Sequence, residues 1–284
     1  MTFVRASAPA SSANLGPAFD AMALALELRC TVDAARADHW KVEHVGPQAP
    51  GPEADDAVLT AARVAAGNDR PLHLVVDNHI PLGRGLGSSS AAFAAGALVA
   101  WRAVGEQHPD ERLFEVVAEL EGHPDNAAAA VYGGLVLTTG VKVHRLPWNP
   151  LLHVLVAVPA KPFATSSARR VLPSAYPRDV VVRSVARTAS LVAGLLTADG
   201  DLLQSAGGDE IHEVPRGPAR PDTNGLVDTA MSSGAYHACW SGAGPSVLAI
   251  VPAEAAHAVH HALAARIDGN GAVIGLEVAT TGAA

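Results

Sequence analysis

The chain has 284 residues, of which 49% are hydrophobic and 17% charged, with a formal net charge of −8. This composition excludes a disordered chain, and the length favours two lobes over one. The acidic balance and an aromatic content of only 4% argue against binding of duplex or single-stranded nucleic acid.

The cysteines and apolar runs indicate a cytoplasmic protein. Cys30 and Cys239 are far apart in apolar sequence, and we interpret them as buried free thiols rather than a disulfide. The longest apolar run, 91–101, is shorter than the roughly 20 residues that a bilayer requires. The first residues are rich in Ala and Ser, like a transit peptide, but they continue directly into a patterned strand. We therefore expect no membrane partner.

The first half of the chain alternates strands with helices, separated by polar loops such as "PASSANLGPAFD" and "GPQAPGPEADD". The predicted strands are 2–8, 21–32, 40–45, 72–80 and 134–138. The predicted helices are 57–67, 88–104, 110–121 and 127–132.

The pattern restarts after "RLPWNP". Strands are predicted at 152–158, 236–240, 247–251 and 272–278. Helices are predicted at 179–198, 222–234 and 254–267. This order is typical of a second α+β lobe. The sequence therefore predicts an N-terminal lobe, 1–148, and a C-terminal lobe, 149–284.

The stretch "PLGRGLGSSSAAF" joins a strand to a helix with three glycines and three serines. Glycines let the backbone approach a ligand, and the N–H groups of a helix N-terminus attract anions. The stretch lacks the lysine of the Walker pattern and the G-x-G-x-x-G spacing of dinucleotide folds. A phosphate site and a plain strand–turn–helix corner are both compatible with this loop taken alone.

Four loops together resemble one family. Pro81-x-Gly83-x-Gly85-Leu-Gly87-Ser-Ser resembles the ATP loop of the GHMP small-molecule kinases, and "SGAGP" resembles their C-terminal glycine motif. "PASSANLGPAFD" and "EGHPDNAAAAVYGG" are similar to the homoserine kinases of that superfamily. The resemblance implies an α+β, two-lobed fold, with an N-terminal lobe like ribosomal protein S5 domain 2 and a ferredoxin-like C-terminal lobe. It also implies ATP-dependent phosphorylation of L-homoserine to O-phosphohomoserine, in threonine biosynthesis.

The resemblance assigns the ATP and Mg²⁺ ligands. The loop expected to bind ATP consists of Pro81, Leu82, Gly83, Arg84, Gly85, Leu86, Gly87, Ser88, Ser89, Ser90 and Ala91. Ser88 and Glu121 are the expected metal ligands, because Mg²⁺ prefers oxygen donors and few carboxylates. Glu115 and Glu119 on the same predicted helix are alternatives to Glu121.

The resemblance also assigns the substrate site, and Asp20 and Asn126 join Ser88 and Glu121 as catalytic residues. The expected substrate residues are Asn14, Asp20, Asp125, Asn126, Thr165, Arg169 and Arg216. Asp20 would pair with an ammonium group, and the two arginines would bind a carboxylate. Asn126 cannot accept a proton, so we favour alignment of the hydroxyl over a dedicated general base.

Ala18 and Ala23 replace glycines of the family pattern, which would cost of order 1 kcal/mol wherever φ is positive. Two other functions stay open: a GHMP kinase for another alcohol, such as mevalonate, and a silent homologue that binds ATP and an amino acid. A homodimer is expected by resemblance.

Overall fold

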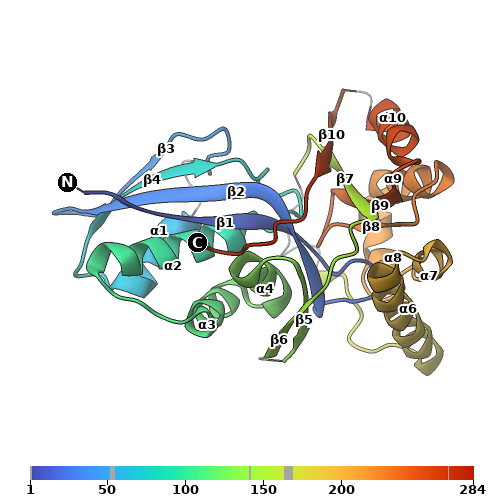
Figure 1. The fold of residues 1–284 in the computed structure, drawn as a ribbon, viewed down its shortest axis with the longest axis horizontal. Helices are drawn as coiled ribbons and strands as arrows, with labels where there is room; N and C mark the ends of the chain where they lie inside the picture. The colour runs from blue at the N-terminus through green and yellow to red at the C-terminus, as the bar shows by residue number, and fades with distance from the viewer. Residues whose placement is uncertain (1, 52–54, 141, 163–168, 268) are drawn as a thin grey trace.

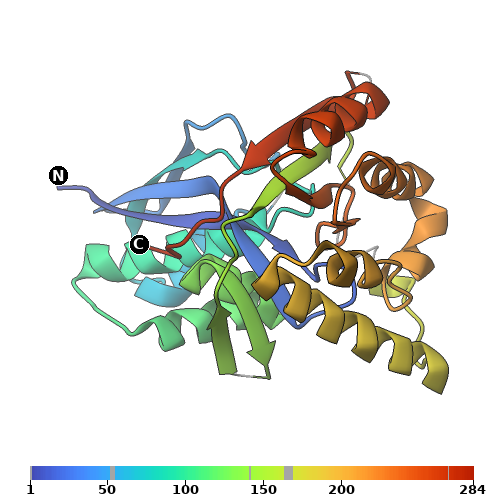
Figure 2. The ribbon, with the colours of Figure 1, turned by 45° about the vertical axis from the view of Figure 1, so that its right-hand side comes forward.

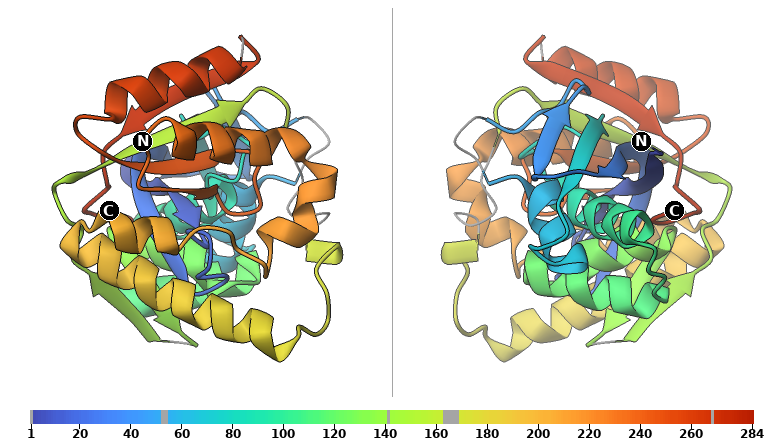
Figure 3. Two further views of the ribbon diagram at one scale, coloured as in Figure 1. Left: turned by 90° about the vertical axis from the view of Figure 1, so that its right-hand side faces the viewer. Right: turned by 90° about the vertical axis from the view of Figure 1, so that its left-hand side faces the viewer.

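The structure is a computed structural model that describes residues 2–51, 55–140, 142–162, 169–267 and 269–284. Its first sheet has the strand order β3-β4-β2-β5-β6, with β1 paired to β2 (Figure 1). The strands are β1 (Val4–Ala13), β2 (Met22–Arg36), β3 (Lys41–His44), β4 (Leu72–Asn78), β5 (Leu135–Thr139) and β6 (Lys142–Leu146). The helices are α1 (Ala57–Ala66), α2 (Ser88–Val104), α3 (Asp110–Glu121) and α4 (Pro124–Tyr132). Figures 1 and 3 show α1 and α2 on one face of this sheet.

The second sheet is antiparallel throughout, with the order β10-β7-β9-β8. Its strands are β7 (Leu152–Pro159), β8 (His237–Trp240), β9 (Val247–Pro252) and β10 (Gly271–Leu276). The helices are α6 (Arg178–Thr197), α7 (Gly200–Ser205), α8 (Glu213–Arg216), α9 (Pro221–Ser232) and α10 (Ala256–Ile267). When the four strands are numbered in chain order within this lobe, their order across the sheet is 4-1-3-2. This is the expected ferredoxin-like arrangement.

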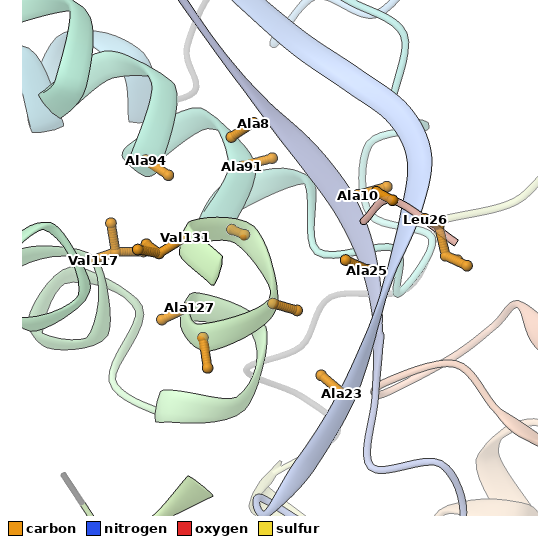
Figure 4. Packing of buried hydrophobic residues seen from close by; sticks show 14 of the residues in the cluster. Ala8, Ala10, Ala23, Ala25, Leu26, Ala91, Ala94, Val117, Ala127 and Val131 are labelled. Atoms are coloured by element: carbon orange, nitrogen blue, oxygen red, sulfur yellow. The ribbon is translucent and has the colours of Figure 1, made fainter. Parts of the chain in front are cut away.

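Small side chains fill the core between the first sheet and its helices. Ala8, Ala10, Ala91 and Ala94 are fully buried where β1 meets α2 (Figure 4). With alanine on both sides, a helix approaches a sheet closely enough to exclude water and to pack at the density of a crystal.

The chain end returns to the first sheet. Ser7 and Ala284 exchange two backbone hydrogen bonds of 2.8 and 2.9 Å, and Leu26 pairs with Val278. The chain passes from the first sheet to the second between Leu146 and Leu152. The residues after β10, however, lie against the first sheet. The lobe bounds 1–148 and 149–284 stay a prediction.

Several predicted elements were wrong at their ends. β1 continues to Ala13, so "PASSA" is a strand and not part of the loop; a register shift between Pro9 and Ala10 accommodates the proline. α4 begins at Pro124 rather than at 127, because proline fits the first turn of a helix. The elements β6, α7 and α8 were missed. One described helix, α6, is long and apolar enough to cross a bilayer by length and composition alone, which is weak evidence for a membrane span.

Candidate active site

The glycine loop has the conformation that only glycine adopts easily. Gly83, Gly85 and Gly87 have φ values of 64°, 72° and 63°. A Cβ on Gly85 would lie 2.2 Å from the carbonyl oxygen of Ser241, and one on Gly87 would lie 2.0 Å from Ser11 Oγ. Both distances are shorter than any real Cβ contact. Only glycine therefore fits at these two positions, because other segments lie against the loop there.

The loop joins the two sheets. Ser241 Oγ donates a 2.7 Å hydrogen bond to the Gly85 carbonyl, and Asn14 Nδ2 donates one of 3.0 Å to Gly242. Arg84 donates to the carbonyls of Leu82, Pro159 and Ala160, and so ties the loop to the end of β7. Motifs from the start, middle and end of the chain therefore meet at the N-terminus of α2.

A cavity of about 310 Å³ opens in front of this loop, and we call it the loop pocket. Its wall includes every expected ATP-loop residue from Pro81 to Ser89, whereas Ser90 and Ala91 are fully buried behind it. Asp56 also lines this cavity, and it caps α1 and contacts His44 at 2.7 Å. Backbone N–H groups and a helix N-terminus facing one cavity make an anion site.

The expected metal ligands, Ser88 and Glu121, both line this pocket. Ser89 Oγ donates a 2.8 Å hydrogen bond to Glu121 Oε1, whereas Ser88 Oγ faces Asn78 Nδ2 at 3.5 Å. Glu121 Oε2 is buried and has no hydrogen-bond partner among the described residues. Glu115 instead is 64% exposed and pairs with Arg112. A half-satisfied buried carboxylate beside a hydroxyl fits Mg²⁺, which takes few protein ligands and completes its shell with phosphate and water.

A second, smaller pocket lies beside the first, and we call it the zwitterion pocket. It is lined by six of the seven predicted substrate residues, Asn14, Asp20, Asp125, Asn126, Arg169 and Arg216. The seventh, Thr165, lies outside the described residues. Phe19 and His123 also line it, and neither was a predicted site residue.

Asp20 and Arg169 form a two-pronged ion pair in the zwitterion pocket, with oxygen–nitrogen distances of 2.8 and 3.1 Å. Asp20 has a positive φ of 55°, and its N–H donates to Asn14 Oδ1 at 3.0 Å. Strained backbone of this kind gathers at functional sites. Ala18 and Ala23 are not among the positive-φ residues, so neither carries the expected penalty.

Both arginines of the pocket sit over the Phe19 ring. The guanidinium carbons of Arg169 and Arg216 lie 5.7 and 5.6 Å from its centroid, within range of cation–π attraction. Arg216 is only 2% exposed, and burial together with the neighbouring Arg169 charge lowers its pKa. The Phe19 ring therefore lies against both guanidinium groups of the pocket.

The "HPDN" turn forms the wall between the pockets. His123 Nδ1 contacts Asp125 Oδ1 at 3.0 Å, and Asn126 Oδ1 accepts a 2.8 Å hydrogen bond from Ser11. Burial alone would lower the pKa of His123, but the hydrogen bond and charge of Asp125, together with Glu121, raise it above its ordinary value. His123 and Asn126, with Gly242 and Ala243, line both pockets, so the cavities share one wall.

Known proteins are similar to this chain in sequence and in architecture. Residues 56–134 match the family model "GHMP kinases N terminal domain", and 189–269 match "GHMP kinases C terminal". The homoserine kinase of Lactiplantibacillus plantarum is 40% identical over 253 residues, which cover 86% of each chain. That of Streptomyces coelicolor is 39% identical over 90% of this chain and 87% of its own. The chain belongs to the homoserine kinase family of GHMP kinases. The homoserine kinase structure from Cytophaga hutchinsonii superposes with a TM-score of 0.87 at 26% identity, covering 100% of this chain and 97% of that one.

Within this GHMP kinase fold, sequence reasoning missed three residues that shape the zwitterion pocket. Phe19 stands beside Asp20, and His123 directly precedes Pro124, so each lay next to a residue already singled out. His212, four residues before Arg216, contacts that arginine at 2.9 Å. The i, i+4 spacing on a short helix was the available signal for this contact.

Proposed function

We propose that this chain transfers the γ-phosphoryl group of ATP to the side-chain hydroxyl of L-homoserine. One observation supports this above the others: the loop pocket and the zwitterion pocket share the His123–Asn126 wall. Phosphoryl transfer asks a protein chiefly to hold two reactants in line and to neutralise charge. A triphosphate in the first pocket would end at the shared wall, where the hydroxyl of a small amino acid in the second would meet it.

The glycine loop and α2 would bind the triphosphate through backbone N–H groups. When bound, Mg²⁺ would neutralise charge on the phosphates. Glu121 would hold it, with either Ser88, the predicted hydroxyl ligand, or Ser89, which the contact with Glu121 favours. Among the described residues, no group of three or more His, Cys, Asp or Glu side chains gathers as a metal site. This suits a metal bound mainly by phosphate and water.

The zwitterion pocket would bind the amino acid end to end. Arg169 and Arg216 would hold the carboxylate, and Asp20 would pair with the ammonium group. Asn126 and Asp125 would orient the hydroxyl toward the γ-phosphorus. Asp125 already accepts hydrogen bonds from the Asn126 N–H and contacts His123, so alignment, with late proton loss to the phosphate, suits this site better than a dedicated base.

Magnesium-dependent ADP release, measured against a panel of amino acids and alcohols, tests the proposal. We expect release with L-homoserine and little with mevalonate, which has no ammonium group for Asp20. Release with mevalonate alone would indicate a GHMP kinase for another alcohol. Nucleotide binding without turnover on any member of the panel would indicate a silent homologue. We further expect a cytoplasmic enzyme of threonine biosynthesis, and growth of a homoserine kinase-deficient bacterium without threonine would test that placement.

A further inference from the structure

A fully buried histidine, to which the proposed function gives no role, lies directly behind the zwitterion pocket. His212 immediately precedes α8 and is 0% exposed. Its ring Nδ1 lies 2.9 Å from Arg216 Nη1, and its ring Nε2 lies 2.9 Å from the carbonyl oxygen of Gly16. Gly16 belongs to the turn between β1 and β2, which also supplies Asp20. The imidazole of His212 therefore connects an arginine of the pocket to the turn that carries the pocket's aspartate.

The turn between β1 and β2 extends from the first sheet to the helices of the second half of the chain (Figure 2). Two buried histidines of that half contact successive carbonyl groups of the turn. His212 Nε2 lies 2.9 Å from the Gly16 oxygen, and His237 Nε2 lies 3.1 Å from the Leu15 oxygen. Of these two histidines, only His212 also contacts an arginine, because the other ring nitrogen of His237 faces the carbonyl oxygen of Leu203.

The two partners of His212 determine the protonation state of its ring. A guanidinium group can only donate hydrogen bonds, and a carbonyl group can only accept them. Nδ1 must therefore accept from Arg216 while Nε2 donates to Gly16, so the ring is neutral with its proton on Nε2. Asp209 Oδ2, which lies 3.7 Å from the same Nε2, also favours a proton there. Burial lowers the pKa of His212 to about 4, which agrees with a neutral ring.

Contacts on other sides hold the His212 ring in place. Asp209 Oδ2 accepts hydrogen bonds of 2.6 and 2.8 Å from the N–H groups of His212 and Glu213. The ring stacks on Phe19, with centroids 5.2 Å apart and an angle of 26° between the planes. The guanidinium carbon of Arg216 lies 5.6 Å from the centroid of the same Phe19 ring. A tilt of the His212 ring would therefore displace both Phe19 and Arg216, which line the zwitterion pocket.

We propose that His212 is a positioning residue, which orients the guanidinium group of Arg216 for the substrate carboxylate. The proposal rests on the proposed function, in which Arg216 and Arg169 hold that carboxylate. An arginine binds a carboxylate through two parallel hydrogen bonds only when the plane of the guanidinium group is correctly set. The hydrogen bond from Arg216 Nη1 to Nδ1 fixes that plane from the side of the protein.

A neutral acceptor suits this task better than a charged one. The imidazole of His212 accepts a hydrogen bond from Arg216 and leaves the positive charge of the guanidinium group uncompensated by a carboxylate at this position. A carboxylate in its place would form an ion pair with Arg216 and would compete with the carboxylate of the substrate. The neutral ring thus orients the arginine while preserving its charge for the ligand.

Two substitutions separate the positioning of Arg216 from bulk stability. The side-chain oxygen of His212→Asn can replace Nδ1 as the acceptor for Arg216. His212→Gln instead places its amide near the position of Nε2, where it can contact Gly16, and leaves Arg216 without that acceptor. We expect His212→Gln to raise KM for homoserine roughly tenfold or more, with KM for ATP unchanged and His212→Asn much closer to the wild type. Equal damage from both variants, or equal damage to both KM values, would overturn the proposal.

His237→Gln is the matched control, since His237 is also fully buried and contacts the same turn. We expect it to destabilise the fold in urea unfolding but to raise KM for homoserine less than His212→Gln does. If the two glutamine variants raised this KM equally, the effect would come from the turn and not from Arg216, and the proposal would be wrong.

A substrate without a carboxylate tests the role of Arg216 directly. The compound 3-amino-1-propanol has the ammonium and hydroxyl groups of homoserine and lacks its carboxylate. His212→Gln should lower kcat/KM for homoserine roughly tenfold or more and should leave kcat/KM for 3-amino-1-propanol close to that of the wild type. Equal losses with both compounds would show that His212 does not act through the carboxylate site.

Nitrogen NMR of histidine-labelled wild-type protein gives a test that is independent of how the variants fold. It should show the Nε2-protonated, neutral ring of His212 at neutral pH, and a proton on Nδ1 would overturn the proposal. A wild type that lacks homoserine-dependent ADP release, yet shows the Nε2-protonated ring, would instead refute the proposed function.

Discussion

The loop pocket and the zwitterion pocket share a wall but are built differently. The first is made mainly of backbone: glycines with positive φ, held by Ser241 and Ser11, at the start of α2. The second is made of charged side chains, and its ion pair between Asp20 and Arg169 is already formed. The loop pocket offers backbone N–H dipoles at the start of a helix, whereas the zwitterion pocket holds an ion pair whose two charges match those of an amino acid.

This difference has a consequence for selectivity. A bound amino acid must replace one internal ion pair with two new ones, its carboxylate on the arginines and its ammonium group on Asp20. A ligand with only one of the two charges would leave a partner uncompensated in a partly buried pocket, which is unfavourable. The zwitterion pocket should therefore discriminate strongly between an amino acid and a ligand that carries only one of the two charges.

The largest expected effect comes from Gly85→Ala. The new Cβ would lie 2.2 Å from the carbonyl oxygen of Ser241. Ser241 cannot move away without separating the "SGAGP" motif from the glycine loop. We expect kcat/KM for ATP to fall by roughly 100-fold or more, since strain and displacement add. Gly83→Ala is the matched control, because Gly83 also has positive φ but its nearest neighbour is the Pro162 side chain at 3.2 Å. Equal losses in the two variants would show that φ alone matters and that the lobe contact does not.

Arg169→Ala should damage the other pocket selectively. It removes a two-pronged, charge-assisted site, so KM for homoserine should rise by roughly 100-fold while KM for ATP changes little. Steady-state kinetics with each substrate varied in turn measures the split, and Arg170→Ala, one residue along the chain, serves as the control. Comparable increases in both KM values would contradict the separation of the two pockets.

The same contrast explains what the sequence could predict. The predicted helices 88–104 and 110–121 matched α2 and α3 to the residue, and the glycine loop was recognisable. These features could be predicted because they depend on residues that are neighbours in the chain. "PASSA" was misread as loop because proline and serine favour turns, while its pairing with β2 is a tertiary effect. The Asp20–Arg169 and His212–Gly16 contacts join residues 149 and 196 positions apart. Local patterns carry no information on such contacts.

Serine substitutions at the start of α2 test which hydroxyl would bind magnesium in the loop pocket. The structure places Ser89, rather than Ser88, against Glu121. We expect Ser89→Ala to lower kcat roughly tenfold and to raise the magnesium concentration needed for half-maximal rate, with a smaller effect from Ser88→Ala. Magnesium titrations of both variants decide between the two hydroxyls. A larger effect at Ser88 would restore the ligand predicted from the sequence.

The last prediction concerns stability at Glu213, in the short helix α8 that also supplies Arg216. Glu213 accepts a 2.7 Å hydrogen bond from the Trp240 N–H, and burial raises its pKa to about 8. Above a pH of about 4.5 the unfolded chain loses this proton, whereas the folded chain keeps it until about 8. The folded state therefore loses stability, relative to the unfolded state, as the pH rises through that window.

Glu213→Gln keeps the acceptor oxygen and removes the titration. It should unfold like the wild type near pH 4.5 and become progressively more stable than the wild type as the pH rises to about 8, as measured by urea unfolding. Glu210→Gln provides a control of opposite sign. Arg183 and Arg187 lower the pKa of Glu210 to about 2, so its charge stabilises the fold at neutral pH and this stability is lost in acid. If the free energies of unfolding of the wild type and Glu213→Gln differed by a constant amount from pH 5 to 8, Glu213 would have the same pKa in the folded and unfolded states. The helix that supplies Arg216 would then not hold a buried neutral acid.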